Sequence, residues 1–221
     1  MFEQILNLVF PPKCIFCKKI LSIGAKLYIC EDCCTKIPYM KNGNIKLIKA
    51  SNYYDDIICV CEYSGIIKEA LIRYKFFNKP SYYRTFAQLL YNKINEMTEW
   101  EKVDIIISVP LHRKKERQRG YNQSHLISKH LGKLLGIKVD RSLIIRTKNT
   151  DSQSLLNRAE RLKNVKDAFQ VTDTKAVYGK SILILDDIFT TGTTLNECCK
   201  VLKSSGARKV TAAVIATGRK F

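Results

Sequence analysis

Two adjacent acidic residues stand directly before a threonine-rich loop in the segment "SILILDDIFTTGTTL", at positions 181–195. The segment predicts a strand, a loop and a helix start, where free backbone amides, a helix dipole and hydroxyl groups suit a phosphate. A phosphate would be repelled by Asp186 and Asp187, so these acids need hydroxyl or cation partners beside it. Ribose 5-phosphate has both halves, because its 2- and 3-hydroxyls can donate to the acids. We expect the phosphate contacts to come from Thr190, Thr191, Gly192, Thr193 and Thr194.

Other interpretations of this segment are weaker. A helix cap needs one such residue, whereas the segment offers two acids and four threonines. An apolar strand ending in two acids also resembles the magnesium-binding strand of P-loop NTPases. That family requires G-x4-G-K-[ST] earlier in the chain, and neither this pattern nor the G-x-G-x-x-G dinucleotide pattern is present in the sequence.

A second segment, "VPLHRKKERQRGYNQ", follows another apolar run and is strongly basic. Guanidinium and ammonium groups at the end of a buried strand suit a pyrophosphate, which needs several donors. For any single cation here, a solvated surface position is an equal alternative. Asn122 either caps the helix that follows or touches a ligand, and His112 is well placed in the same loop. The five cations of the segment are Arg113, Lys114, Lys115, Arg117 and Arg119.

The N-terminal part of the chain contains two C-x2-C knuckles, "CIFC" and "CEDC", separated by twelve residues. Paired knuckles supply the four ligands of a tetrahedral zinc site, and this spacing leaves no open coordination position. We therefore predict structural zinc on Cys14, Cys17, Cys30 and Cys33, with Cys34 as the alternative to Cys33. The metal would stabilise a module too small for a core of its own.

The composition suits a globular protein with an anionic partner. The 221 residues are 46% hydrophobic, and 38 basic against 20 acidic residues give a net charge of +18. This charge indicates either a lysine-rich surface or a polyanion partner, such as nucleic acid or a phosphorylated small molecule. No apolar run approaches the length of a membrane span. The opening "MFEQILNLVFPP" predicts a short amphipathic helix, not a signal peptide, so we expect a cytoplasmic protein.

From about residue 55, apolar strand patterns alternate with amphipathic helix patterns. This alternation predicts an α/β fold with an open, mostly parallel sheet covered by helices on both faces. Strands are expected in "DIICVCEY", "VDIIISVP", "SLIIRT", "SILILDD" and "KVTAAVIAT". Cysteine content falls near residue 50, so we predict a zinc-binding module with a short helix at 1–50 and a ligand-binding domain at 51–221.

The segment at 181–195 resembles the phosphoribosyl-pyrophosphate motif of type I phosphoribosyltransferases. "SVPLHRKKERQRGYNQSHLIS" and "RTKNTDSQSLLNRAERLKNVKDAF" resemble successive blocks of the ComF-like competence-protein family, whose knuckles the N-terminal cysteines also match. The resemblance covers nearly the whole chain. It implies a zinc ribbon joined to a phosphoribosyltransferase-like domain that binds phosphoribosyl pyrophosphate with Mg²⁺.

The resemblance also implies roles for individual residues. Asp186 and Asp187 would be the catalytic acids, and a mobile loop would carry Gln153 and Arg158, although a plain surface loop is an equal alternative there. Lys75, in a Lys-Phe pair, either reaches the ligand or is solvated while Phe76 packs. The pyrophosphate loop would consist of Pro110, Leu111, His112, Arg113 and Lys114.

Two functions remain open from the sequence. The first is a phosphoribosyl-pyrophosphate-binding protein of DNA uptake that handles incoming single-stranded DNA, together with proteins of the uptake machinery. Aromatic residues among lysines can stack on unpaired bases. The second is an active phosphoribosyltransferase of nucleotide metabolism or salvage with an unknown acceptor. The aromatic candidates for stacking are Tyr53, Tyr54, Phe76, Phe77, Tyr82 and Tyr83.

Overall fold

The computed structural model describes residues 11–25, 27–40, 44–45, 52–98, 100–148 and 165–219. The amphipathic helix predicted in the first twelve residues lies outside this range almost entirely. The mobile-loop candidates Gln153 and Arg158 also lie outside it.

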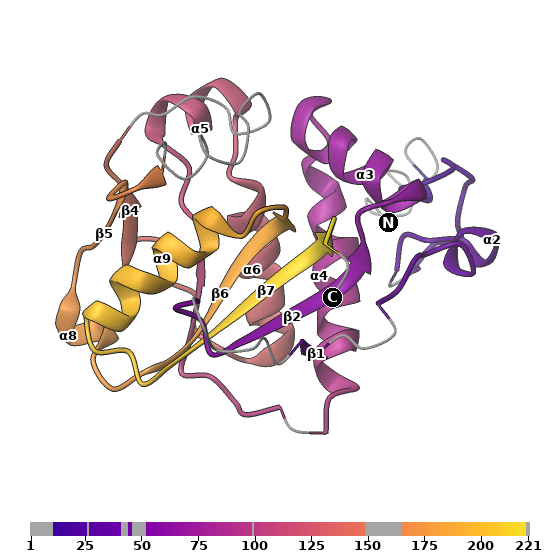
Figure 1. Ribbon diagram of the computed structural model, residues 1–221. Coiled ribbons are helices and arrows are strands. Elements are labelled where there is room, and N and C mark those ends of the chain that lie inside the picture. The colour runs from indigo at the N-terminus through magenta and orange to yellow at the C-terminus, as the bar shows by residue number, and fades with distance from the viewer. Residues whose placement is uncertain are drawn as a thin grey trace.

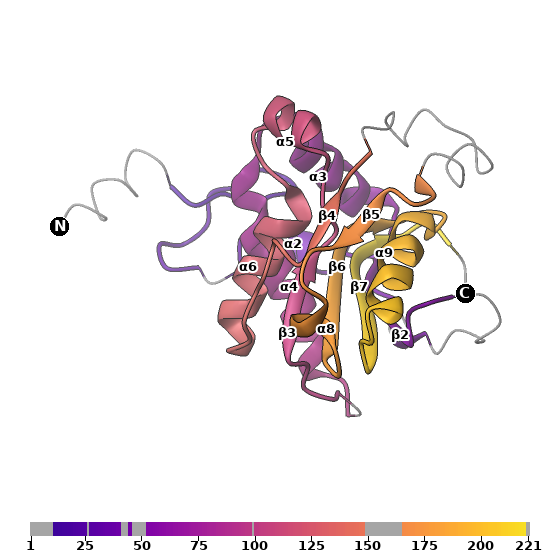
Figure 2. The ribbon, with the colours of Figure 1, turned by 90° about the vertical axis from the view of Figure 1, so that its left-hand side faces the viewer.

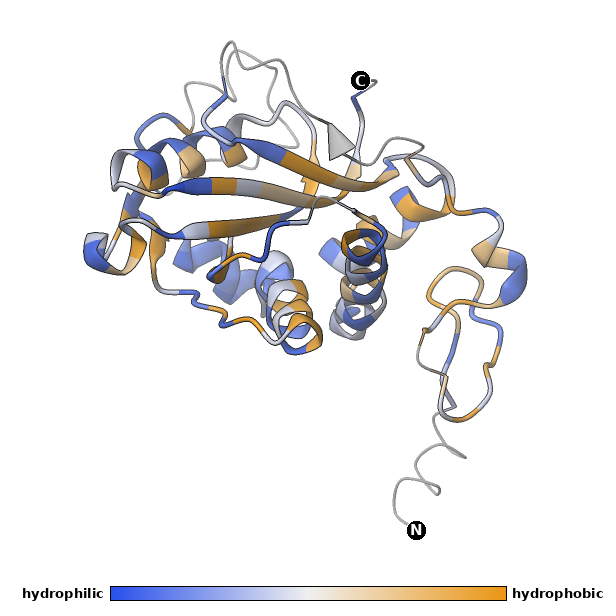
Figure 3. Cartoon of the chain, turned by 90° about the horizontal axis from the view of Figure 1, so that it is seen from below, coloured by the Kyte–Doolittle hydropathy of each residue, from blue (hydrophilic) through white to orange (hydrophobic). Residues whose placement is uncertain are grey.

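The main sheet has five strands in the order β1–β2–β7–β6–β3 (Figure 1). Strands β2 (Asp56–Glu62), β7 (Lys209–Thr217), β6 (Ser181–Phe189) and β3 (Ile105–Ser108) run parallel to one another, and β1 (Asn44–Ile45) is antiparallel to β2. The parallel strands are mostly apolar, as expected for strands whose two faces are buried. Figure 3 shows hydrophobic residues running along these strands.

Helices cover both faces of the sheet (Figure 2). On one face, α3 (Gly65–Phe76), α4 (Tyr83–Asn95) and α6 (Gln123–Leu135) share a core cluster, and the 3₁₀ helix η1 (Pro80–Tyr82) leads into α4. On the other face, α9 (Thr193–Ser204) and the short α8 (Thr174–Val177) pack on the second cluster. The predicted α/β architecture is therefore confirmed.

Two parts of the fold differ from the sequence expectation. The strand predicted around "SLIIRT" forms as β4 (Ile144–Arg146), but it pairs antiparallel with β5 (Phe169–Val171) in a separate two-stranded sheet. The basic segment expected to be a loop contains a helix, α5 (Arg113–Arg119). None of its residues is buried, so the sequence has no apolar periodicity there that would indicate a helix.

The N-terminal module packs against the larger domain. It contains α2 (Glu31–Cys34), and its buried residues join the same core cluster as those of α3 and α4. Arg73 on α3 donates from Nη2 to the carbonyls of Ile15 and Phe16, at 3.4 and 3.3 Å. The boundary near residue 50 remains a prediction, since β1 lies before it and pairs with β2 after it.

None of the helices in the described part of the chain has the length and apolar composition needed to cross a membrane.

Candidate ligand-binding site

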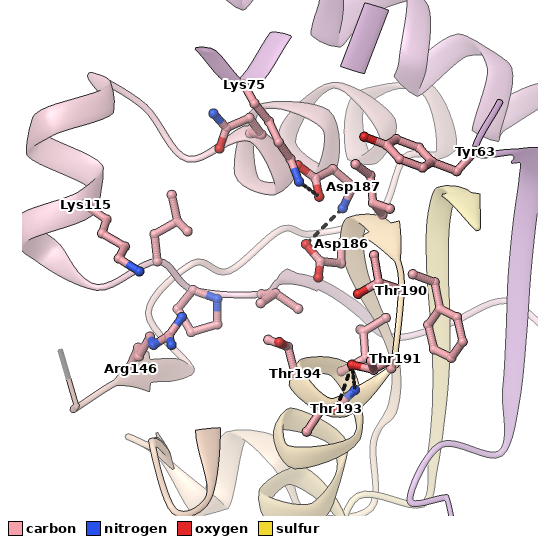
Figure 4. Close-up of a pocket in the computed structure, with 18 of the residues that line it drawn as sticks. Tyr63, Lys75, Lys115, Arg146, Asp186, Asp187, Thr190, Thr191, Thr193 and Thr194 are labelled. Atoms are coloured by element: carbon pink, nitrogen blue, oxygen red, sulfur yellow. Dashed lines mark hydrogen bonds and ion pairs between the residues drawn. The ribbon is translucent and has the colours of Figure 1, made fainter. Parts of the chain in front are cut away.

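A pocket of about 370 Å³ opens where β6 and β3 end, at the carboxyl edge of the parallel sheet (Figure 4). Ligands of open α/β sheets bind at this edge, because the loops and helix starts there point outward together. The pocket is lined by Asp186, Asp187 and all five residues of the predicted phosphate loop, 190–194. The structure thus brings the predicted phosphate and ribose candidates into one cavity.

The threonine loop turns the chain from β6 into α9 at Gly192. This residue has φ +78 and is the N-cap of α9, and a Cβ there would meet the ring of Phe189 at 2.5 Å. Both facts require glycine. Thr191 Oγ1 and Thr193 Oγ1 are 2.8 Å apart. The loop therefore presents hydroxyls and the first amides of a twelve-residue helix to the pocket.

Arg219 holds this loop from the C-terminal side. Its Nε donates to the carbonyl of Thr190 at 3.1 Å, its Nη2 donates to the carbonyl of Thr191, and the guanidinium lies 5.0 Å from the ring centre of Phe189. The sequence analysis did not identify Arg219. Its position beside the threonine loop depends on the pairing of β7 with β6, which the sequence near residue 219 does not indicate.

The two acids have different surroundings. Asp187 is 6% exposed and pairs with Lys75, whose Nζ is 2.8 Å from Asp187 Oδ1. Asp186 Oδ1 accepts from Ser124 Oγ and from the backbone N of Asp187, each at 2.9 Å. Burial, followed by the charge of Asp187, raises the pKa of Asp186 to about 7 against the opposing effect of Lys75. Asp186 therefore binds or releases its proton near neutral pH when no ligand is bound.

Lys75 and Phe76 lie differently from the alternative in which Lys75 is solvated and Phe76 packs. The lysine lines the pocket, while Phe76 is 60% exposed and does not pack in the core. The ring of Phe76 instead lies 5.5 Å from the guanidinium carbon of Arg119. Lys75 therefore lines the pocket and pairs with Asp187, while its contact with a ligand stays a prediction.

The predicted pyrophosphate residues divide into two groups. Pro110 and Leu111 line the pocket, but His112, Arg113 and Lys114 do not. His112 is the N-cap of α5, and its Nδ1 accepts from the backbone N of Lys114 at 3.3 Å. A pyrophosphate role for these three residues stays a prediction.

Other cations line the pocket instead. Lys115 and Arg119 reach it from α5, and Arg146 reaches it from β4. Burial lowers the pKa of Arg146, while the nearby charges of Cys198 and Asp186 oppose that shift. The four-residue spacing of Lys115 and Arg119 places them on one face of α5, but the sequence does not indicate this helix and so did not identify them.

Asn122 caps α6, as one of its two predicted roles requires. Its Oδ1 accepts from the backbone N of His125 at 3.1 Å, and its Nδ2 donates to the carbonyl of Val109 at 3.0 Å. The amide is thereby used to fix the start of α6 to the end of β3. This places the first residues of α6, including Gln123 and Ser124, beside the two acids.

The four predicted cysteine ligands form a cluster. The Sγ atoms of Cys14, Cys17, Cys30 and Cys33 all lie within 4.8 Å of one another, and Cys17 and Cys30 are 3.5 Å apart. Tetrahedral zinc with Zn–S bonds of about 2.3 Å holds its sulfurs about 3.8 Å apart, so the cluster fits such an ion. Cys34 is exposed and does not belong to the cluster. These residues could therefore hold a metal such as zinc.

Comparison with known proteins agrees with this arrangement. The phosphoribosyl transferase domain family matches residues 76–220. Competence protein F of Haemophilus influenzae is 30% identical over 215 residues, covering 90% of this chain and 93% of that protein. The chain belongs to the ComF-like family of phosphoribosyltransferase-fold proteins.

Two further similarities of this ComF-like chain have lower sequence identity. Competence protein ComFC of Bacillus subtilis is 25% identical over 193 residues, covering 87% of this chain and 72% of that protein. Among solved structures, glutamine phosphoribosylpyrophosphate amidotransferase from B. subtilis, complexed with ADP and GMP, aligns with a TM-score of 0.44 and 16% identity. That alignment covers 65% of this chain and 30% of that chain.

Proposed function

We propose that this ComF-like protein binds phosphoribosyl pyrophosphate with Mg²⁺ and acts in DNA uptake, where it handles incoming single-stranded DNA in the cytoplasm. The observation that carries the proposal is one pocket in which the threonine loop lies beside the Asp186–Asp187 pair. The relatives named Competence protein F and Competence protein ComFC support the DNA-uptake role.

The pocket suggests an orientation for the ligand. The 5-phosphate would bind the threonine loop at the start of α9, and the ribose hydroxyls would donate to the acids. The pyrophosphate and its Mg²⁺ would then face Lys115, Arg119 and Arg146, which line the same cavity. Each part of the ligand meets groups of suitable charge and hydrogen-bonding type.

Calorimetry tests the ligand assignment. Phosphoribosyl pyrophosphate is expected to bind with Mg²⁺ and to bind more weakly after chelation of Mg²⁺, because the metal neutralises part of the pyrophosphate charge. Ribose 5-phosphate should bind more weakly, and ribose should not bind. Absence of heat with phosphoribosyl pyrophosphate, confirmed by an equilibrium dialysis that finds no bound ligand, would remove the assignment.

The cysteine cluster is assigned to one structural zinc ion per chain, since four thiolates at this spacing leave no position for substrate. Elemental analysis of the purified protein should find one zinc per chain. Absence of zinc together with four freely reactive thiols would contradict the assignment.

Single-stranded DNA binding is supported by the net charge of +18 and by exposed groups beside the pocket. Of the six aromatic candidates, Phe76 and Phe77 are 60% and 63% exposed, whereas Tyr54 and Tyr82 are buried. Arg113, Lys114 and Arg117 are exposed on α5.

Salt dependence tests this DNA interaction. Affinity for an oligonucleotide should fall steeply with salt because bound cations are released, and replacing Arg113, Lys114 and Arg117 with glutamine should flatten that slope. A flat slope for the unmodified protein, or no binding at low salt, would count against the DNA role.

An active phosphoribosyltransferase is the second candidate function. It is favoured by the cations Lys115 and Arg119 in the same pocket as the acids, where a departing pyrophosphate would need them. The acceptor is then a nucleobase or an amine. Release of pyrophosphate in the presence of such acceptors supports turnover, and its absence across a panel supports a binding role.

A further inference from the structure

Gln123, the first residue of α6, carries a buried amide group with one atom left unpaired. The residue is 2% exposed and lines the ligand pocket. Its Oε1 accepts from Arg119 Nη1 at 2.8 Å. Its Nε2 is buried and has no hydrogen-bond partner among the described residues.

The orientation of this amide follows from the chemistry of its neighbour. A guanidinium group can only donate hydrogen bonds, so the oxygen of Gln123 must face Arg119 and the NH₂ group must face away. A flipped amide would place donors against donors. The unpaired group of Gln123 is therefore its donor, a buried atom of a residue that lines the pocket.

Contacts on both sides hold Gln123 in place. The guanidinium of Arg119 lies against the ring of Phe76, and the backbone carbonyl of Gln123 accepts from Tyr74 Oη at 2.9 Å. Both Phe76 and Tyr74 belong to the last turn of α3. The donor is thus fixed before any ligand enters, which lowers the entropy lost on binding.

A buried donor without a partner is unfavourable, and folded proteins leave few of them. One on a pocket wall is explained when a ligand supplies the acceptor. Gln123 adjoins Arg119 of α5, which together with Lys115 lines the pocket where the proposed pyrophosphate would lie. The threonine loop, by contrast, serves the 5-phosphate in the proposed orientation.

We propose that Gln123 is a specificity-determining residue whose Nε2 donates a hydrogen bond to an oxygen at the pyrophosphate end of the ligand. This inference rests on the proposed binding of phosphoribosyl pyrophosphate. Gln123 distinguishes a sugar phosphate that carries a second anionic group from one that carries only the 5-phosphate. A neutral amide suits the position because it is buried, where another unpaired charge would be far less favourable.

The test is Gln123→Glu, which keeps the shape and the oxygen that Arg119 needs but replaces the donor with an anionic acceptor. Affinity for phosphoribosyl pyrophosphate with Mg²⁺ is expected to fall by about tenfold or more, because a donor to a charged oxygen is lost. Affinity for ribose 5-phosphate should change by less than about twofold, because this ligand has no pyrophosphate oxygen to accept the hydrogen bond. Gln123→Met, which removes the donor without adding charge, should show the same preference with a smaller loss.

The control is Gln118→Glu, which makes the same change of charge at an exposed position of α5. It should leave both affinities unchanged, and thermal melting of all variants should confirm that they fold.

If the unmodified protein binds phosphoribosyl pyrophosphate and both Gln123 variants bind it equally well, the inference about Gln123 alone is wrong. Equal loss for both ligands also overturns it, since the amide would then support the whole pocket. If the unmodified protein binds neither ligand, the proposed function is wrong, and so is the inference about Gln123 that rests on it.

Discussion

At the scale of single residues, the pocket keeps two carboxyl groups next to each other at a cost in stability. Asp187 is compensated by Lys75, but Asp186 has a pKa raised to about 7, chiefly by burial and then by the charge of Asp187. Ser124 donates to Asp186 and only partly offsets this. Such an arrangement is typical of a site that is completed by its ligand.

Asp186→Asn is expected to stabilise the ligand-free protein at pH 8. The folded-state pKa of Asp186 is above its unfolded value, so its favourable contribution is present at low pH and is lost as pH rises through about 7. The gain of the asparagine variant should therefore grow by about 1–3 kcal/mol between pH 5 and pH 8. Urea unfolding at both pH values measures it, and an equal difference at the two values would contradict the raised pKa.

Substitutions of Asp187 and of the threonines should change ligand affinity in different ways. Asp187→Asn removes charge from the ribose contacts, so affinity for phosphoribosyl pyrophosphate should fall about tenfold or more while phosphate binds at least as well. Replacing Thr191 and Thr193 with valine should weaken both ligands, since their hydroxyls serve the shared phosphate. Titrating both variants with both ligands separates the roles. If the asparagine variant loses phosphate as severely as the valine variant, the carboxylates support the loop and not the sugar.

At the scale of elements, α5 changes which cations can serve the pocket. The helix directs Lys115 and Arg119 into the cavity and leaves Arg113, Lys114 and Arg117 exposed. In an extended loop, these cations would not be separated into a group that faces the pocket and a group that faces the solvent. The same helix therefore presents one set of cations to the pocket and another to the solvent.

Lys115→Met is expected to weaken phosphoribosyl pyrophosphate by about three- to tenfold and ribose 5-phosphate less, because the ammonium faces the proposed pyrophosphate. The matched control is the double change Arg113→Ala and Lys114→Ala, for which calorimetry should show little loss of either ligand. The reverse ranking would assign the pyrophosphate contact to Arg113 and Lys114, as the family resemblance implies.

At the scale of the whole molecule, the cysteine module and the larger domain share one core. Cys14, Cys30 and Cys33 belong to the same cluster as residues of α3 and α4, and Arg73 joins α3 to the backbone of the first knuckle. On the opposite side of α3, Lys75 reaches Asp187. The module is therefore expected to unfold together with the domain on which it packs.

Removal of the metal by a chelator should lower the Tm of a single unfolding transition by more than about 5 °C. Structural zinc contributes several kcal/mol, and each kcal/mol shifts Tm by about 2–4 °C in a chain of this size. Calorimetry of the chelated protein and of Cys17→Ser should agree. Cys34→Ser is the control, because this exposed thiol lies outside the cluster. An unchanged main transition would show that the module folds independently.

Local sequence determined the features that depend on neighbours along the chain. Continuous apolar runs specified the buried parallel strands, the C-x2-C spacing specified the cysteine cluster, and the order of acids, threonines and glycine specified the threonine loop. In each case the residues lie within one or two turns or strands. Neighbouring residues therefore decide each of these local features, whereas the pairing of one strand with another does not follow from them.

Tertiary structure alone decided the contacts between distant segments. Lys75 meets Asp187 across 112 positions (187 − 75), Arg219 returns to the threonine loop, and Arg119 orients Gln123 beside a pocket formed by other elements. The exposed helix α5 left no apolar period, so its inward cations could be assigned only after the pocket was known. The sequence determined which chemical groups the site contains, whereas strand order and helix packing decided which of them face the same cavity, because that choice depends on long-range contacts which no local pattern records.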